Sequence, residues 1–377
     1  IHVSIMTNDC WVDFQNYLGA TFIITLIAIF LSGLLLFIDV VLQKTLCKEW
    51  KCVKRRQINK FSPKDWLIMI SRVSGLVGLI LFSGLFTSTV RRSFTDASSF
   101  DIPQMWWHSL ASAWNIFICI IFSVYVAQIP TKKVGLPQLH KGKANWKPDG
   151  MKWVMRLGLS LTISMLTHGI TPTMYVAADC CDGFDMPDYS QDSVGNIIYF
   201  FALQQFCFII NAADEETSWR GFVNAVWVAE GVFGRWVMYI MSGFVYAGVH
   251  TLNMLSSFRD PSYFLMVFNL TCEGAAWMYL YRTTGDLITN WCQHHIDDIF
   301  SLWFGGETLA GYALPMGQIS PFLINCPNKY ISGGDFGTGA SFIYIIQNVA
   351  TVLFILAFDL LVVRRKKFVL KKSHLFA

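Results

Sequence analysis

The segment GNIIYFFALQQFCFIINAADEETSWR, residues 195–220, joins a charge-free apolar run to a cluster of ionisable side chains. As a helix rising ~1.5 Å per residue, residues 195–213 are long enough to cross a ~30 Å hydrocarbon layer. A charged side chain near the bilayer centre costs about 2.5–3.5 kcal/mol on the insertion scale, so charged groups are kept there where they pair or line a wet cavity. The segment therefore predicts a membrane helix that leads into a polar interior.

The rest of the chain has the same character. Hydrophobic residues make up 54% of the 377 residues and charged residues only 14%, whereas soluble domains have roughly a quarter charged residues. Further apolar runs occupy residues 17–42, 66–86, 110–129, 154–178 and 341–363, and weaker runs occupy residues 221–234, 236–255, 262–281 and 287–303. We therefore predict an all-α fold, a polytopic transmembrane bundle of roughly 8–10 helices.

Ionisable residues are spread unevenly along this bundle. The first four spans contain few of them, whereas carboxylates and histidines enter the apolar segments repeatedly from Asp214 onward. We expect three parts: N-terminal transmembrane scaffold helices in residues 1–194, a functional core in residues 195–304, and a polar loop with a final transmembrane helix and basic tail in residues 305–377. This many buried charges within one part predicts a polar chamber there.

Basic residues concentrate in residues 44–64, 132–156 and 364–372, and an acidic loop covers residues 179–192. By the positive-inside rule the two basic loops are cytoplasmic and the acidic loop faces outward. The tail fits this scheme only if residues 305–340 add a crossing or residues 341–363 start from the other face. Basic patches beside apolar spans are signals of topology, so we expect membrane lipids and no nucleic acid as partners. The pattern does not distinguish a bacterial plasma membrane from the endoplasmic reticulum or an organelle.

Two features of the ends and loops add expectations. No positively charged region, short apolar core and cleavage site precede the first span, so we expect no signal peptide. Cys180 and Cys181 lie in the predicted outer loop and Cys326 in another polar loop, where a disulfide could form in an oxidising compartment.

The ionisable cluster at the start of the core has helical spacing. Asp214 is a plausible N-cap, with Glu215 opening the following helix. Glu216 and Arg220 are four residues apart in the favourable order for an ion pair, which leaves Glu215, about 100° around the helix, to face elsewhere. With Glu215 at a helix start, alternating crossing directions would bring this cluster and the later histidines to one membrane face, the cytoplasmic one.

Two later helices carry histidines in apolar surroundings. Tyr246 and His250 are four residues apart near the end of one run, and His294 and Asp298 share one face of another. Taken separately, each pattern is also typical of a hydrogen-bonded structural histidine. The order and spacing of all three patterns together are more specific.

Glu-Glu-x-x-x-Arg at residues 215–220, Tyr-x-x-x-His at 246–250 and His-x-x-x-Asp at 294–298 resemble the motifs of the CPBP family of intramembrane endopeptidases. This family includes CAAX prenyl endopeptidases and bacteriocin-processing (Abi) proteins. The resemblance covers about residues 212–304.

Flanking residues extend the resemblance. Arg220-Gly221-Phe222 and Thr284-Gly285-Asp286-Leu287 are similar to segments that flank the family motifs. Two positions depart from the common pattern: Tyr246 replaces Phe, and Asp298 stands where Asn is commoner although the family admits Asp.

The resemblance implies a peptidase that acts on a membrane-associated or lipid-modified protein or peptide. Glu215 would be the catalytic carboxylate and, with His250, would activate a water molecule. His294 and Asp298 would stabilise the oxyanion or hold that water, and Glu216, Arg220 and Tyr246 would support them. This chemistry agrees with the general need for a base and for a donor aimed at the developing negative charge.

Three alternatives stay open at this stage. Glu215, His250 and His294 have the donor types of a hydrolytic zinc site, but no His-Glu-x-x-His motif is present, so we favour no cofactor. The protein could also be a catalytically silent relative that serves as a scaffold or regulatory subunit of a membrane complex. A transporter would need intramembrane carboxylates too, but no paired broken-helix repeats are visible.

Overall fold

The computed structural model describes residues 56–57, 60–67, 69–75, 77–80, 83, 104–121, 139–140, 143–144, 150–177, 184–185, 193–227, 229–251, 260–284, 287–305, 323–324, 331 and 338–364. The predicted first span at residues 17–42 and the predicted disulfide residues Cys180, Cys181 and Cys326 lie outside these ranges.

Helices dominate the described part of the chain. They include α3 (Gln104–Ile121), α5 (Gly150–Ala177), α6 (Val194–Glu215), α7 (Val223–Val226), α8 (Gly231–Thr251), α9 (Pro261–Thr284), α10 (Leu287–Gly305) and α12 (Phe342–Phe358). Residues 63–67, 69–75 and 77–80 are helical as well. Two wider π-helical turns, η4 (Glu216–Phe222) and η8 (Asp359–Arg364), continue α6 and α12, and a 3₁₀ turn, η7 (Thr338–Ala340), precedes α12. The predicted all-α fold is confirmed.

The strands are only two residues long and connect loops. β1 (Arg56–Gln57) pairs in parallel with β5 (Ala229–Glu230), with Arg56 opposite Ala229. β2 (Leu139–His140) pairs antiparallel with β3 (Lys143–Ala144), and β4 (Phe184–Asp185) pairs antiparallel with β6 (Leu323–Ile324).

Two helical segments among the described residues, Val194–Ala225 and Phe342–Val362, are long and apolar enough to cross a membrane. Shorter apolar helices lie at Ser109–Ile120 and Leu157–Ile170. Large apolar side chains are exposed along several helices, for example Phe206 on α6 and Phe244 on α8. Exposed apolar surface of this kind is expected where lipid covers a protein. The full number of crossings stays a prediction.

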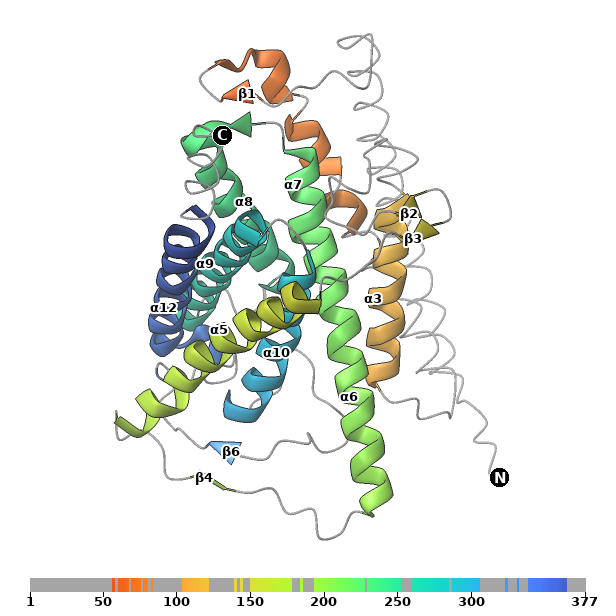
Figure 1. The fold of residues 1–377 in the computed structure, drawn as a ribbon, viewed down its shortest axis with the longest axis vertical. Helices are drawn as coiled ribbons and strands as arrows, with labels where there is room; N and C mark the ends of the chain where they lie inside the picture. Colours follow the sequence, from red (N-terminus) through yellow and green to blue (C-terminus); the bar gives the residue numbers. More distant parts are fainter. Residues whose placement is uncertain are drawn as a thin grey trace, which may run out of the picture.

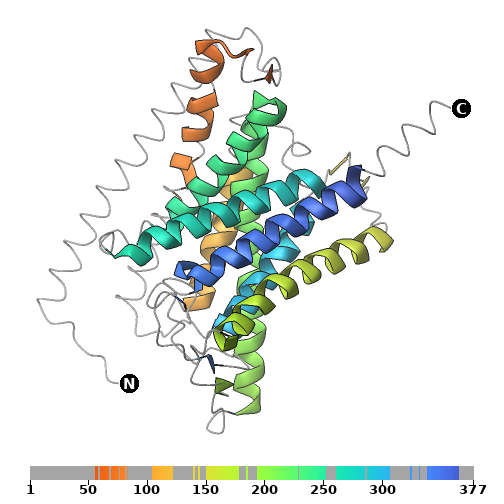
Figure 2. The same ribbon diagram turned by 90° about the vertical axis from the view of Figure 1, so that its left-hand side faces the viewer.

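The helices are arranged around α6 and α10. In Figure 1, α3 lies alongside α6, and α10 passes between α6 and α5. Figure 2 shows α12 (dark blue) and α5 (yellow-green) crossing the upright α6 (light green) obliquely. Helices α8 and α9 complete the enclosure of the central turn η4, which both helices contact.

The start of the core differs from the prediction. Ser193 caps α6 by accepting a hydrogen bond from the backbone N–H of Asn196 (3.1 Å), and the helical path then continues through η4 and α7. Asp214 therefore lies inside a helix. The prediction that Asp214 is an N-cap and Glu215 a helix start was wrong, and with it the argument that placed all motifs near one membrane face.

The physical reason is that Asp214 has other partners. Its carboxylate accepts hydrogen bonds from Asn115 of α3 (3.0 Å) and from Ser218, one helical turn further on (3.1 Å). Because these donors satisfy a buried carboxylate, the helix does not need to end in order to solvate it.

Glycines bring α8 and α9 into close contact. A Cβ atom on Gly243 would overlap the carbonyl oxygen of Thr271, and one on Gly274 would lie 2.8 Å from the Cα of Gly243. Small residues of this kind allow helix backbones to approach each other in membrane proteins. The contact fixes α8, which carries His250 near its end, against α9.

Candidate active site

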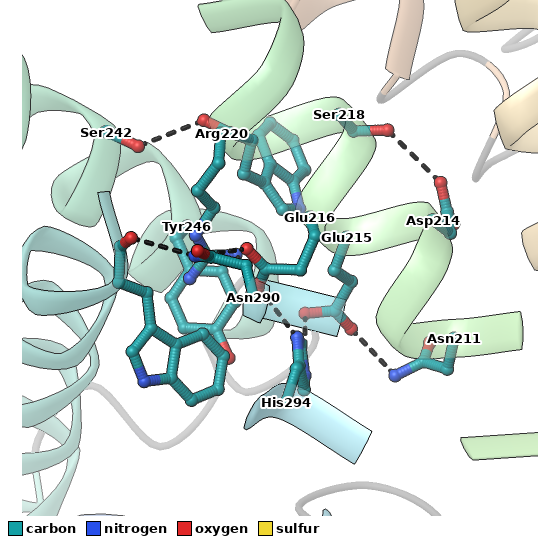
Figure 3. A network of polar contacts seen from close by, with 12 residues as sticks. Asn211, Asp214, Glu215, Glu216, Ser218, Arg220, Ser242, Tyr246, Asn290 and His294 are labelled. Carbon is teal, nitrogen blue, oxygen red and sulfur yellow. Dashed lines mark hydrogen bonds and ion pairs between the residues drawn. The ribbon is translucent and has the colours of Figure 1, made fainter. Parts of the chain in front are cut away.

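The Glu-Glu pair lies where α6 passes into the π-helical turn η4, and side chains from α8, α9 and α10 surround it (Figure 3). Glu215 is the last residue of α6 and Glu216 the first of η4. Because successive helical residues point about 100° apart, the two carboxylates enter different surroundings. π-helical turns inside α-helices often occur at functional sites.

Glu215 faces two histidines. Its Oε2 atom lies 3.5 Å from Nε2 of His250 and 3.7 Å from Nε2 of His294. Its other oxygen, Oε1, accepts a hydrogen bond from the side-chain amide of Asn211, one helical turn earlier (3.0 Å). Helices α6, α8 and α10 thus bring three separate sequence motifs together at the Glu215 carboxylate.

Both imidazole rings are held through Nδ1. In His250 this nitrogen is 2.9 Å from the carbonyl oxygen of Tyr246, and in His294 it is 2.9 Å from Oε1 of Glu216. A carbonyl accepts but cannot donate, and a carboxylate paired with an arginine is an acceptor as well, so Nδ1 is the donor in both rings. Each ring consequently presents Nε2 to Glu215.

Aromatic rings pack against both imidazoles. The Tyr246 ring centroid is 4.2 Å from that of His250, and the Trp277 centroid is 4.4 Å from that of His294. These contacts restrict rotation of the rings, which preserves the direction in which each Nε2 atom points.

Glu216 forms a buried ionic cluster. Its Oε1 lies 3.1 Å from Nη1 of Arg220, and its Oε2 accepts a hydrogen bond from Nδ2 of Asn290 (3.0 Å). Both Glu216 and Arg220 are fully buried, with 0% of each side chain exposed. The Arg220 guanidinium also lies over the rings of Tyr246, 4.5 Å from the centroid, and Trp277, 4.8 Å away. The pairing predicted from spacing is present, and cation–π contacts reinforce it.

Asp298 reaches the same cluster from α10. Its Oδ1 lies 3.6 Å from Nε2 of His294, one helical turn away. The exposed fraction of the side chains falls from 28% for His250 through 15% for Glu215 to 9% for Asp298 and 3% for His294. His250 is therefore the most exposed of these four side chains.

Several residues at the site were missed by sequence reasoning. Asn211 lies four residues before Glu215, and Asn290 four residues before His294. Amide side chains one helical turn from each candidate were a usable signal, because such residues share a helix face. Trp277, which contacts both His294 and Arg220, carries no polar signal and could not have been found in this way.

The donor set of Glu215, His250 and His294 is of the type that holds zinc. Within the part of the chain that the structure describes, however, no group of three or more His, Cys, Asp or Glu side chains is arranged to hold a metal ion. Zinc binding at this site stays an untested alternative.

Residues 197–300 match a protein-family model described as Rce1-like, type II CAAX prenyl endopeptidase Rce1-like. The matched segment extends from α6 into α10 and contains all three motifs. The predicted resemblance to CPBP endopeptidases is confirmed for this segment. The family is one of integral membrane proteins, in agreement with the two membrane-length helices. Searches of curated proteins and of solved structures find no match.

Proposed function

We propose that this protein is an intramembrane endopeptidase that hydrolyses a peptide bond in a membrane-associated, lipid-modified protein. The proposed substrate is a C-terminal C-a-a-X segment whose cysteine carries a prenyl group. The observation that supports this proposal best is the position of the Glu215 Oε2 atom, which faces the Nε2 atoms of His250 and His294 at 3.5 and 3.7 Å. The family match at residues 197–300 supports the choice of substrate class.

In the proposed mechanism Glu215 is the general base. Its Oε2 has no hydrogen-bond partner among the described protein groups, and both imidazoles are just beyond the usual hydrogen-bond range of about 2.7–3.2 Å. This oxygen can therefore accept a proton from a water molecule that His250 helps to hold. The resulting hydroxide attacks the carbonyl carbon of the scissile bond, and the carbonyl oxygen gains a negative charge.

His294 is placed to stabilise that charge. With Nδ1 donating to Glu216, a protonated ring would donate from Nε2 to the oxyanion, and the nearby carboxylates of Glu216 and Asp298 would stabilise the imidazolium. When the tetrahedral intermediate collapses, the C–N bond breaks and the proton held by Glu215 moves to the leaving amine. The products are a new carboxyl terminus and a released short peptide.

The test uses the full-length protein in liposomes with a farnesylated C-a-a-X peptide, and mass spectrometry of the released fragment. We expect Glu215→Gln to lower the cleavage rate about 10²–10⁴-fold, the usual contribution of a general base. Thr162→Ala on the exposed face of α5 is the control and is expected to cleave at the wild-type rate.

Two further arms sharpen the result. The same peptide without the prenyl group should be cleaved poorly, and equal cleavage of both peptides would refute the substrate class. Activity should survive a zinc chelator; loss in the chelator and recovery with added zinc would instead support the metal-dependent alternative. If Glu215→Gln cleaved as fast as the wild type, the assignment of Glu215 as the base would be wrong. If the wild type itself did not cleave, the scaffold alternative would be favoured.

A further inference from the structure

Helix α10 carries two rows of polar residues that are offset by one position. The first row, Asn290, His294 and Asp298, faces the glutamate pair and is called the site row. The second, Thr289, Gln293 and Asp297, is called the anchor row. Residues at positions i, i+4 and i+8 share one helix face, so the two rows lie on neighbouring faces about 100° apart.

Helix α5 carries a matching row at the same spacing, Ser160, Ser164 and His168. At one end, the hydroxyl of Ser160 donates to the carbonyl oxygen of Thr289 (3.0 Å). In the middle, the side-chain amide of Gln293 donates to the Ser164 hydroxyl (2.7 Å). The contacts therefore follow both helices in register.

The contacts between the α5 row and the anchor row end at the carboxylate of Asp297. Its Oδ1 atom accepts hydrogen bonds from Ser164 (2.7 Å) and Gln293 (2.8 Å) and lies 2.9 Å from Nε2 of His168. Helix α12 adds Gln347, whose amide nitrogen is 3.5 Å from Nδ1 of the same histidine. Side chains of α5 and α10 thus meet at this carboxylate, directly next in sequence to Asp298, and α12 contacts the histidine that faces it.

These side chains are buried. Ser160, Ser164 and Thr289 are fully enclosed, and His168 and Asp297 are almost so. A buried carboxylate that loses a partner is destabilised by the uncompensated charge. The row therefore holds α10 in a single rotational setting.

We propose that the α5 row is part of the catalytic apparatus although it lies outside the matched segment 197–300, with His168 and Asp297 acting as positioning residues for the site row. This inference depends on the proposed function. Both rows belong to one rigid helix. Side-chain tips lie about 5–6 Å from the helix axis, so a rotation of about 20° would move them by about 2 Å. A misplacement of about 1 Å can cost about 100-fold in rate.

The experiment compares His168→Phe, which removes the ring nitrogen facing Asp297, with His168→Gln, whose amide can still donate to it. For cleavage of the farnesylated peptide we expect His168→Phe to lower kcat at least about tenfold with KM within about twofold, because substrate contacts stay in place. His168→Gln should recover kcat to within about threefold of wild type. Thr162→Ala, on the opposite exposed face of α5, should be unchanged.

A milder variant covers the case in which His168→Phe does not fold. Ser164→Ala removes one hydroxyl and should lower kcat several-fold, with a smaller loss of stability than His168→Phe, because Asp297 keeps Gln293 and His168 as partners. The inference is overturned if His168→Phe or Ser164→Ala keeps the wild-type kcat, or if KM alone changes. These failures differ from failure of the proposed function, in which the wild type does not cleave or Glu215→Gln remains active.

Discussion

The two glutamates of the central turn are neighbours in sequence, yet their surroundings are opposite. Glu216 is fully buried and has three partners, Arg220, His294 and Asn290, at 2.9–3.1 Å. Glu215 is 15% exposed and has one close partner, Asn211, while its second oxygen faces two imidazoles at longer range. One side chain is saturated with interactions, and the other keeps an oxygen available.

This difference teaches how a membrane-embedded site can be both stable and reactive. A buried ion pair needs all its partners, because an unpaired charge in a low-dielectric interior is costly. A general base needs the reverse, an oxygen that is near donors but not committed to them. Placing the two functions on adjacent residues lets one helical turn carry both.

The largest expected effect comes from the saturated member of the pair. Glu216→Gln keeps the size of the side chain but leaves Arg220 buried without its counter-charge, so we expect a loss of about 3–5 kcal/mol in the free energy of unfolding. Unfolding by titration with a denaturing detergent measures it. The same substitution one residue earlier, Glu215→Gln, should change stability by less than about 1 kcal/mol. Equal losses at both positions would refute the contrast.

An intermediate effect is expected from the single close partner of the reactive member. Asn211→Ala removes the hydrogen bond to Oε1 of Glu215, so the carboxylate is less well oriented. We expect the cleavage rate to fall about tenfold, which corresponds to about 1.4 kcal/mol in the transition state, with little change in stability. Asn196→Ala, at the exposed beginning of the same helix, is the matched control. Identical rates for the two variants would show that Asn211 does not orient the base.

The smallest effect is expected at the edge of the site. In the wild type, Oδ1 of Asp298 lies 3.6 Å from Nε2 of His294. Asp298→Asn keeps a side-chain oxygen that can take this position and removes only the negative charge. We expect the cleavage rate to stay within about threefold of the wild type, since the remaining carboxylates still stabilise the ring. A loss of 100-fold or more would show that the charge of Asp298 takes part in catalysis directly.

Local patterns predicted much of this arrangement. Apolar run length predicted the helical fold, and the four-residue spacing predicted both the Glu216–Arg220 pair and the shared face of His294 and Asp298. These succeed because a helix fixes the geometry of near neighbours, whatever surrounds it.

Long-range partners were beyond such reasoning. Asp214 has the residue type of a helix cap, and only the donor Asn115, on a helix far away in sequence, explains why it lies within a helix instead. Likewise, the spacing of Ser160, Ser164 and His168 is visible in the sequence, but its meaning depends on the facing row of α10. The partner of a polar residue in an apolar run is known only once the packing of the helices is known.

The one-residue offset between the site row and the anchor row makes α10 sensitive to length rather than to composition. Inserting a single residue near its middle would turn every later position by about 100°, so that the catalytic imidazole and the carboxylate that braces the helix could no longer both meet their partners. Related chains should therefore tolerate gaps before or after this helix and almost none within it.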